Sequence, residues 1–589
     1  MKKLLEWIEE EVAQAFEDAG YDRALGVVTP SNRRDLCEFQ CNGAMAGAKK
    51  YHKAPLQIAE EVASKLQNSE ILEKAEPVKP GFLNLTLKPE TIRKYVVEMM
   101  HAKHFGAGES TPDQTIVIDY GGPNVAKPLH VGHLRAAIIG ESLKRIFRYT
   151  GNKVIGDIHM GDWGLQMGLI LTELKRRQPD LPYFDPSYTG EYPKEAPFTI
   201  SELEEIYPTA SAKSKEDEAY RAEAMEDTRK LQNGERGLRA LWHHIVNVSV
   251  ADIKRNYDML NVDFDLWWGE STVNDVIAPM IEDMKQRGYA KESQGALVVD
   301  VSEETDKKEV PPCMLLKSDG AALYTTTDLA TIQKRMDDFH PDEIVYVVDK
   351  RQDLHFIQCF RTARKTKMVL PETVLIFVGF GTMNGKDGKP YKTREGGVPR
   401  LEVLIGDTEE KMYERVKEAN PDMEEEKARE TAHKIAVAAI KYGDLSNQPS
   451  KDYVFDLDKF TSFEGDTGPY ILYTMVRIKS ILAKYEAEGK KAKDAKLASA
   501  GSKEEKALAL ELCTFADSVE EARKTYAPTR VCAYIYGLCN TFNSFYHQTH
   551  ILKESDPEKK ESYIALLYIT LQVLEAAVDL LGFEAPDAM

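Results

Sequence analysis

The spacing of apolar residues along the chain predicts that it begins with a small α+β domain, residues 1–112. Apolar positions recur at helical spacing in "LLEWIEEEVAQAF" (4–16) and "APLQIAEEVASKLQ" (54–67). The run "GFLNLTL" (81–87), directly after Pro80, alternates apolar and polar residues as a half-buried strand does. Helices followed by strands of this kind favour a unit with its own small core.

Between residues 113 and 404 the pattern changes to strands that alternate with helices. The run "AAIIGESLKRIFRYTG" (136–151) predicts a helix that ends at a glycine. The predicted strands are "TIVIDY" (115–120), "KVIGDI" (153–158), "EIVYVV" (343–348) and "TVLIFVGF" (373–380). This alternation predicts a Rossmann-type, mainly parallel sheet, in which ligands bind beyond the carboxyl ends of the strands. The polar stretch around 175–240 predicts a helical insertion with a solvated, charged face.

From residue 405 to residue 589 the strands nearly vanish. Long helical patterns follow one another in "KARETAHKIAVAAIKYG" (427–443), "PYILYTMVRIKSILAKYEAE" (469–488) and "SYIALLYITLQVLEAAVDLLG" (562–582). Consecutive helices without strands predict an all-α bundle. The fold class is therefore α/β, with an N-terminal α+β domain and a C-terminal helical domain.

Composition narrows the class of protein further. The chain has 589 residues, of which 42% are hydrophobic and 29% charged, as in ordinary soluble proteins. We expect no membrane segment and a cytoplasmic location, because no apolar stretch approaches the length of a membrane span and the first helix carries Glu9, Glu10 and Glu11. The seven cysteines form no CxxC pair, so we expect reduced thiols and no protein metal site. The net charge of -19 argues against indiscriminate nucleic-acid binding but leaves a local basic face open.

The segment "GGPNVAKPLHVGHLRAA" (121–137), directly after the first predicted strand of the sheet, carries the most specific chemistry. A helix that starts after Pro128 would point its first backbone N–H groups at an anion. His130 and His133 would lie on one face of the first turn, and Gly132 would leave room for a flat group. Imidazole donors in such a place suit a phosphorus centre that gains charge. Taken alone, an HxGH string is more often two surface histidines.

Six motifs in one order resemble those of class I aminoacyl-tRNA synthetases, and "GPNVAKPLHVGHLR" is similar to the arginyl-tRNA synthetase form of the HIGH motif. The other five, which extend along most of the chain, are "HMGDWGLQMG" (159–168), "YTTTDLA" (324–330), "DKRQDLHF" (349–356), "GKDGKPYKTREGG" (385–397) and the pair "YGDLSNQPSKDYVFD" and "FEGDTGPYILY" (442–456, 463–473). The resemblance implies an ATP-dependent, two-step ligase. The carboxylate of arginine attacks the α-phosphorus of ATP, and the adenylate passes to the terminal ribose of tRNA(Arg), with release of pyrophosphate and AMP.

The same resemblance implies where ATP binds. His130 and His133 would stabilise the α-phosphate, Gly132 would lie under the adenine, and Pro128 belongs to the same ATP-binding segment. The lysine-bearing loop of the family is represented by "KPYKTR", whose catalytic and ATP-binding candidates are Lys389, Lys392 and Arg394. Its ending departs from the family's Lys-Ser, and Lys127 of the PNxAK segment is expected to compensate. Which of the three lysines dominates stays open. Mg²⁺ is expected with ATP, held mostly by phosphates and water.

Arginine recognition should be visible as negative charge, because a guanidinium is best held by carboxylates in paired hydrogen bonds. The candidates that match the family's arginine pocket are Asp119, Asn124, His159, Tyr324, Asp328 and Gln352. Each has a plainer explanation as a cap, a helix charge or a core residue. A carboxylate-lined pocket would reject substrates without a guanidinium, so no editing domain is required.

The C-terminal domain resembles the family's anticodon-binding domain, and the N-terminal domain resembles its additional tRNA-contacting domain. Tyr534, Phe542, Phe545 and Tyr546 are the candidates for stacking on splayed bases, although we expect most of these rings to be buried. The expected partners are tRNA(Arg), arginine and ATP, bound by a monomer. Two alternatives remain: a class I synthetase for another amino acid, and a tRNA-binding paralogue without catalysis. The resemblance also implies little ATP–pyrophosphate exchange without tRNA.

Overall fold

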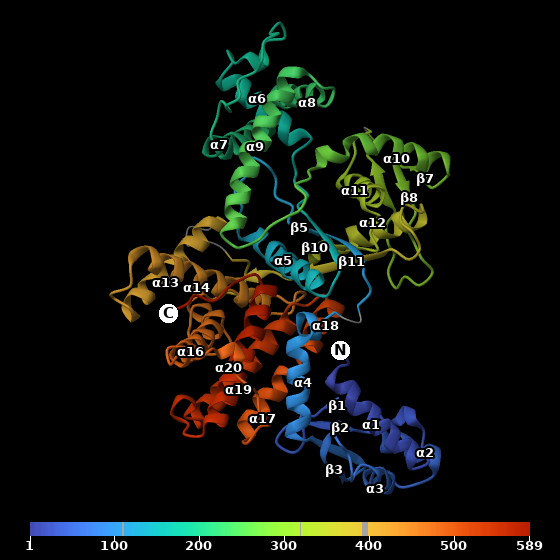
Figure 1. Cartoon of the computed structure of the whole chain (residues 1–589). Helices are drawn as coiled ribbons and strands as arrows, with labels where there is room; N and C mark the ends of the chain where they lie inside the picture. The colour runs from blue at the N-terminus through green and yellow to red at the C-terminus, as the bar shows by residue number, and fades with distance from the viewer. Residues whose placement is uncertain (109–110, 319, 392–397) are drawn as a thin grey trace.

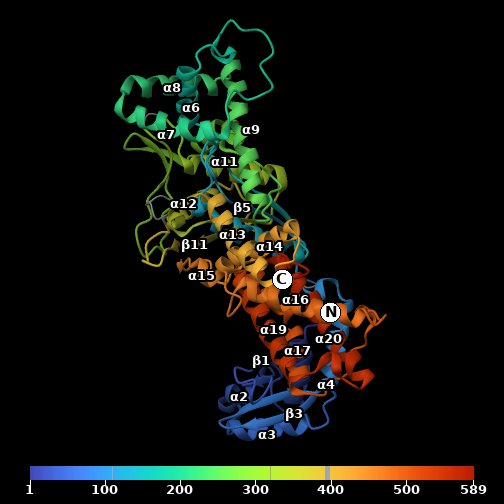
Figure 2. The same cartoon turned by 90° about the vertical axis from the view of Figure 1, so that its left-hand side faces the viewer.

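The computed structural model describes residues 1–108, 111–318, 320–391 and 398–589, and the molecule is elongated in both views (Figure 1, Figure 2). A parallel sheet lies near the centre, a helical insertion forms one end, and the N-terminal domain forms the other. The C-terminal helices lie between the sheet and the N-terminal domain (Figure 2). This architecture confirms the predicted fold class.

The central sheet has four parallel strands in the order β11-β10-β5-β6. Every residue of β5 after Thr115 is buried, as expected for a parallel strand covered on both faces. The chain leaves β5 toward β6 on one side, whereas β10 and β11 add on the other side. The strand order therefore reverses between β5 and β10, which is where such sheets bind ligands. The elements are β5 (Thr115–Tyr120), α5 (Leu134–Tyr149), β6 (Lys153–Asp157), α11 (Tyr324–Phe339), β10 (Glu343–Asp349), α12 (Asp353–Lys365) and β11 (Val374–Phe380).

A buried ion cluster fixes α11 against this sheet. The guanidinium of Arg335 on α11 is fully buried, and its Nη2 donates to Asp119 Oδ2 at the end of β5 and to Asp157 Oδ2 at the end of β6, both at 2.6 Å. Removing one partner of such a cluster leaves an uncompensated buried charge, which is strongly destabilising. The cluster thus fixes the position of α11, and with it the residues that α11 presents to the site.

Two insertions interrupt the sheet domain. The first is a four-helix unit with its own core, and it starts about ten residues before the expected 175–240 stretch; its helices are α6 (Leu165–Arg177), α7 (Ile200–Glu216), α8 (Glu218–Gln232) and α9 (Arg236–Asp258). The second, which the sequence patterns did not predict, is a helix and a small antiparallel sheet: α10 (Asn274–Gln286), β7 (Ala290–Ser293), β8 (Ala296–Val299) and β9 (Cys313–Leu316). Strands of four residues show too little alternation to be recognised by periodicity.

The N-terminal domain is an antiparallel sheet with helices, as expected for an α+β unit. Its strands are ordered β1-β2-β4-β3, and β4 alternates half-buried and buried residues along its length. The elements are α1 (Leu4–Asp18), β1 (Val28–Pro30), β2 (Phe39–Cys41), α2 (Gly43–Tyr51), α3 (Pro55–Lys65), β3 (Leu72–Val78), β4 (Phe82–Leu87) and α4 (Pro89–His101). Helix α4 packs against α17 of the C-terminal domain.

The C-terminal part is a helical bundle whose first helix begins at Leu401, so the expected boundary between residues 404 and 405 falls inside α13. Strand β13 (Tyr453–Val454) pairs in parallel with β12 (Met383–Asn384), which joins the bundle to the segment after β11. The helices are α13 (Leu401–Ala419), α14 (Glu425–Leu445), α15 (Leu457–Phe460), α16 (Gly468–Glu486), α17 (Lys503–Leu512), α18 (Phe515–Thr525), α19 (Thr529–Gln548) and α20 (Pro557–Leu580).

Helix α20 corrects one expectation from the sequence. By length and composition alone its 24 residues could cross a membrane, with a mean hydropathy of 1.6 in the most apolar window. About two thirds of that window (67%) is buried inside the protein, because α20 packs against α5, α16, α17 and α19. Its apolar character is that of a core helix.

Candidate active site

A cavity of about 750 Å³ opens at the carboxyl ends of β5 and β10, where the strand order reverses. It brings together most of the residues that the motifs singled out. Those that line it are Asp119, Asn124, His130, Gly132, His133, His159, Tyr324, Asp328 and Gln352. Residues separated by more than 200 positions in the sequence therefore share one site.

The two histidines line this cavity from a tight turn that precedes α5, and this part of the lining is called the histidine end. Their ring centroids are 4.0 Å apart, which confirms that both rings share one face of the turn. His130 Nδ1 accepts the N–H of Gly132 at 3.0 Å, and His133 Nδ1 accepts the N–H of His130 at 3.2 Å. Because Nδ1 is an acceptor in both rings, the hydrogen of each neutral imidazole is on Nε2. Among the described residues neither Nε2–H has a partner, so each ring can donate one hydrogen bond to a substrate.

This turn differs from the expected helix N-terminus with free backbone donors. A short 3₁₀ turn, Val131–His133, comes first, and α5 starts only at Leu134. The N–H groups of residues 130 to 134 are all paired: the two histidine rings take those of His130 and Gly132, and carbonyls take the others. The prediction of a backbone anion site here was wrong, because the side chains themselves cap the turn. The donors available to an anion are the imidazole Nε2–H groups.

Gly132 lines the cavity, and its lack of a side chain also makes room for the His130 ring. A Cβ atom at this position would lie 2.6 Å from Cε1 of His130, so only glycine allows the His130 ring to fold back onto the turn. Burial, with a contribution from the Lys127 ammonium, lowers the pKa of His130 below its usual value. Burial and the neighbouring His130 ring lower the pKa of His133 to about 3. Both rings are therefore neutral hydrogen-bond donors at neutral pH.

Asn124 and His159 line the cavity from two adjacent segments. Asn124 forms a parallel bridge with Gly161, and a Cβ at Gly161 would lie 2.0 Å from Asn124 Oδ1, so glycine makes room for this amide. His159 Nε2 lies 3.4 Å from Thr331 Oγ1, while its Nδ1 is buried and has no hydrogen-bond partner within the described parts of the chain. Burial lowers the pKa of His159, so it is a neutral ring with an unsatisfied polar atom in the cavity.

A second part of the cavity lining is rich in carboxylates and is called the carboxylate end. Tyr324 and Asp328 lie one turn apart on α11, and both line the cavity, as the four-residue spacing predicts. The Tyr324 side chain is 78% exposed, which excludes the plainer explanation of a core residue. Asp328 Oδ2 is 2.5 Å from His355 Nε2, and Asp119 Oδ2 is bound by Arg335. Neither carboxylate accepts a second protein hydrogen bond among the described residues, so each keeps one oxygen available.

Glu270 and Tyr346 line the cavity as well, but no motif marked them. Burial, reinforced by the charges of Asp162 and Asp328, raises the pKa of Glu270 to about 7. The buried hydroxyl of Tyr346 has no hydrogen-bond partner in the described structure. Glu270 begins a short turn in an unremarkable stretch, and only the fold brings it to Asp328. The one available signal was a glutamate directly after the aromatic run "WWG" (267–269).

Of the remaining ATP-site candidates, Lys127, Pro128 and Lys389 do not line the main cavity. Lys127 Nζ lies over the ring of Tyr207 on α7, 4.4 Å from its centroid, and Pro128 lines a smaller neighbouring hollow of about 130 Å³. Lys389 is exposed in the turn that follows β12, next to Pro390, which does line the cavity. Lys392 and Arg394 lie outside the described residues.

The aromatic residues of α19 are divided by burial. Tyr534, Phe542 and Phe545 are buried in the bundle core, which corrects their assignment as base-stacking residues and confirms that most of these rings are internal. Tyr546 is half-buried, and the guanidinium of Arg477 lies 4.9 Å from its ring centroid. Arg477 also lies 4.9 Å from the ring of Tyr473, which is 44% exposed. Tyr473 and Arg477, on α16, were missed because they are not on the aromatic-rich helix.

Comparisons with known proteins found matching families along most of the chain. Residues 96–457 match the family described as tRNA synthetases class I (R), catalytic domain; residues 471–589 match the DALR anticodon binding domain; residues 3–87 match the arginyl tRNA synthetase N terminal domain. Over the full length of both chains, the sequence is 58% identical to an arginine–tRNA ligase of Agathobacter rectalis and 55% identical to one of Alkaliphilus oremlandii. The fold is similar to the arginyl-tRNA synthetases of Plasmodium falciparum (TM-score 0.81) and Thermus thermophilus (TM-score 0.75), each 24% identical and covered in full.

Proposed function

The chain belongs to the arginyl-tRNA synthetase family, and from this premise we propose how its cavity carries out the reaction. It is an aminoacyl-tRNA synthetase of class I, an arginine–tRNA ligase that uses ATP. The observation that carries the assignment of roles is the polarity of the cavity. One end presents two neutral imidazole donors, and the other presents three carboxylates.

The histidine end is proposed to hold the α-phosphate of ATP. In the first step an arginine carboxylate oxygen forms a bond to the α-phosphorus while the bond to pyrophosphate breaks, and negative charge builds on the phosphoryl oxygens. The Nε2–H groups of His130 and His133 are fixed by backbone bonds to their Nδ1 atoms, so they need no reorganisation as that charge develops. Neutral donors do not lose a proton to the phosphate, so the hydrogen bonds persist through the step.

The carboxylate end is proposed to hold the guanidinium of arginine. Its N–H donors would bind the available oxygens of Asp119 and Asp328 and the carboxyl of Glu270. We place Tyr324 and Gln352 at the rim. Asn124 and the unpaired Nδ1 of His159 are proposed to contact the α-amino and carboxylate end. This places the arginine carboxylate between the two ends, beside the histidine pair.

Lysines are proposed to bind the outgoing phosphates. Lys127 is close enough to both histidines to lower their pKa values, and its ammonium lies over the ring of Tyr207. A cation–π contact of this kind is worth about 1 kcal/mol at a partly exposed site, so a phosphate can displace it. Lys389 lies in the turn beside the cavity and is the second candidate for binding these phosphates. Lys392 and Arg394 keep the roles that the family pattern implies.

Mg²⁺ would enter with ATP. Of the carboxylates that line the described cavity, Asp119, Asp328 and Asp349 are already bonded to Arg335, His355 and Arg351 respectively. These residues fit an ion that is held by phosphate oxygens and water, with no dedicated protein site. Its chemistry there is to neutralise phosphate charge.

Binding of tRNA(Arg) is proposed to use the C-terminal bundle, with the exposed Tyr473 and the half-buried Arg477 and Tyr546 as a stacking surface. Bases stack on aromatic rings and on guanidinium planes alike. The domain at 1–112 is proposed to bind the tRNA body, and the domain at 113 to about 400 is proposed to bind the two small substrates. The domain at about 401–589 is proposed to bind the anticodon region. The protein is further proposed to be cytoplasmic and to act as a monomer. Light scattering with and without tRNA would test the monomeric state.

The experiment that tests this function is ATP-dependent charging of a tRNA pool with each amino acid in turn. Arginine alone should be attached. Charging with lysine but without arginine would contradict the assignment of the carboxylate end, since both are cations but only arginine offers a planar set of donors.

A further inference from the structure

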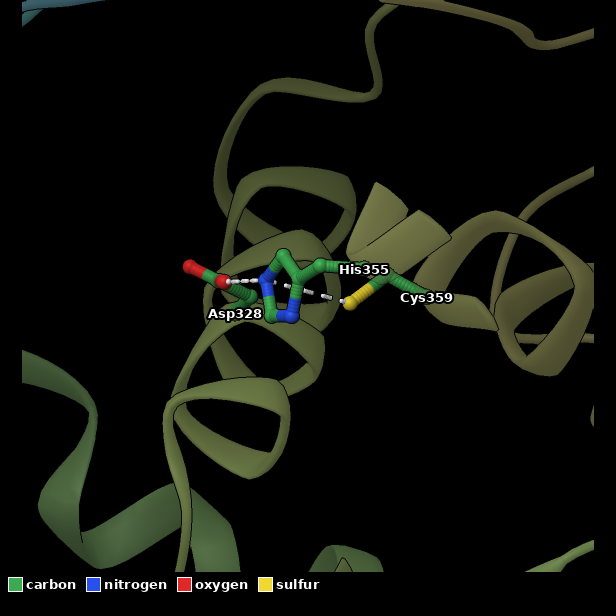
Figure 3. A group of neighbouring side chains, drawn as sticks. All are labelled: Asp328, His355 and Cys359. Carbon is green, nitrogen blue, oxygen red and sulfur yellow. Dashed lines mark hydrogen bonds and ion pairs between the residues drawn. The ribbon is translucent and has the colours of Figure 1, made fainter. Parts of the chain in front are cut away.

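Asp328 has a protein partner that the sequence motifs do not explain. His355 and Cys359 lie one turn apart on α12, and both side chains face Asp328 of α11 (Figure 3). His355 Nε2 is 2.5 Å from Asp328 Oδ2 and 3.7 Å from Cys359 Sγ. Three groups that commonly bind metal ions thus lie within 4.8 Å of one another at the wall of the cavity.

The spacing of these atoms favours a hydrogen bond over a metal site. Two ligands at about 2.0–2.1 Å from a tetrahedral zinc ion lie about 3.3 Å from each other, well beyond the 2.5 Å between His355 Nε2 and Asp328 Oδ2. Burial also raises the pKa of the Cys359 thiol well above its usual value, which disfavours the thiolate that a metal needs. The contact is instead that of a short, charge-assisted N–H···O bond.

We propose that His355 is a positioning residue for arginine recognition: its Nε2–H holds Asp328 Oδ2, so that the carboxylate presents Oδ1 to the guanidinium. An ionised carboxylate only accepts hydrogen bonds, so the hydrogen of this contact is on His355 Nε2. Oδ1 points away from the imidazole ring (Figure 3) and has no protein partner among the residues that the structure describes.

Orientation matters here because of the shape of the ligand. A guanidinium offers its N–H donors in one plane and at fixed angles, so a carboxylate that rotates about its Cβ–Cγ bond loses the alignment. Asp119 is held in the same way, with Oδ2 bound to Arg335 and no partner for Oδ1 in the described parts of the chain. His355 gives Asp328, whose side chain is more exposed than that of Asp119, the rigidity that Arg335 gives Asp119.

This inference rests on the proposed role of Asp328, so the experiment includes both residues. The KM values for arginine and for ATP are measured by aminoacylation with saturating tRNA(Arg), for the wild type and for His355→Ala, His355→Gln and Asp328→Asn. Gln358→Ala is the matched control. Its amide lies one turn further along α12 and donates to the carbonyls of Pro311 and Pro312, away from Asp328. Thermal unfolding of each variant reports any loss of folding.

His355→Ala should raise the KM for arginine about tenfold, the usual effect of losing a hydrogen bond to a charged group, and leave the KM for ATP unchanged. His355→Gln should restore most of the loss, because its amide places an N–H near the position of Nε2. Gln358→Ala should change neither KM value.

Each of the other outcomes would contradict the positioning role of His355 or the arginine-binding role of Asp328. If Asp328→Asn raises the KM for arginine but His355→Ala does not, the positioning role is overturned and the arginine site stands. If neither variant affects arginine selectively, the proposed role of Asp328 fails as well. If Co²⁺ added to the holoprotein gives a sulfur-to-metal absorption band that Cys359→Ser removes and Cys539→Ser keeps, the group is a metal site, and the positioning role is wrong.

Discussion

The two ends of the cavity are built by different means. At the histidine end, backbone N–H groups hold His130 and His133, and both side chains are neutral. At the carboxylate end, other side chains hold Asp119 and Asp328, and the groups are charged or poised to become charged. The difference follows from what each end binds. A phosphorus centre that gains negative charge needs fixed neutral donors, whereas a cation that is already charged needs acceptors of fixed direction.

The largest effect should come from a His133 variant that keeps the acceptor at the Nδ1 position and loses the donor at the Nε2 position. In His133→Asn the amide oxygen can still accept the N–H of His130, but the donor at the Nε2 position is lost. We expect kcat for adenylate formation to fall about 10²–10³-fold, as on removal of a donor to a developing oxyanion, with the KM for arginine unchanged. Rapid-quench measurement of adenylate checks this. An equal rise in the KM for arginine would mean that the two ends are not independent.

Asp328→Asn should give the opposite result. Loss of a charged acceptor should raise the KM for arginine about 10- to 100-fold, whereas the KM for ATP should stay near that of the wild type. Steady-state aminoacylation measures both values. Equal effects on the two substrates would indicate that Asp328 only supports helix α11.

The pH dependence of arginine binding should report Glu270. Its pKa of about 7 means that it is protonated at lower pH, and a cation binds better to the carboxylate form. Arginine affinity should therefore rise as the pH passes upward through 7 and level off above it, by up to about tenfold per unit on the acidic side. Isothermal titration between pH 6 and pH 8.5 tests the slope. Glu270→Gln should remove it, and an unchanged slope in that variant would assign the titration to another group.

The smallest effect should be on tRNA affinity and should come from a residue outside the cavity. Tyr546→Ala should weaken tRNA binding about fivefold, at the low end for loss of one stacked base, without change in the KM for arginine or ATP. Filter binding measures the affinity. Phe542→Ala is the contrasting variant: its ring is buried, so it should cost about 3–5 kcal/mol of stability. Similar tRNA affinities for Tyr546→Ala and the wild type would remove Tyr546 from the RNA surface.

The two ends also differ in how far the sequence revealed them. The HxGH segment is contiguous, so the pairing of its rings followed from i, i+3 spacing, and only the capping of the turn by its own side chains was missed. The carboxylate end is assembled from β5, α11, α12 and the turn at Glu270, and no local pattern reports such distances. Tyr324 and Asp328 were found because one helix carries both. Glu270 and His355 emerged only from packing.

The length and burial of each element also decided whether the sequence revealed it. Long apolar runs such as β5 and β10 were identified because burial on both faces leaves a strong signal. The four-residue strands β7, β8 and β9 were missed because they are too short to show alternation. In α19 the aromatic stripe at helical spacing indicated a buried face, and Tyr534, Phe542 and Phe545 belong to it.

The most direct test of the division between the two ends is a crystal structure with a non-hydrolysable arginyl-adenylate analogue. The account predicts phosphate oxygens within hydrogen-bond distance of Nε2 of His130 and His133, and the guanidinium bound by Oδ1 of Asp328 and by Glu270. A guanidinium bound elsewhere, or a phosphate that contacts neither imidazole, would contradict it.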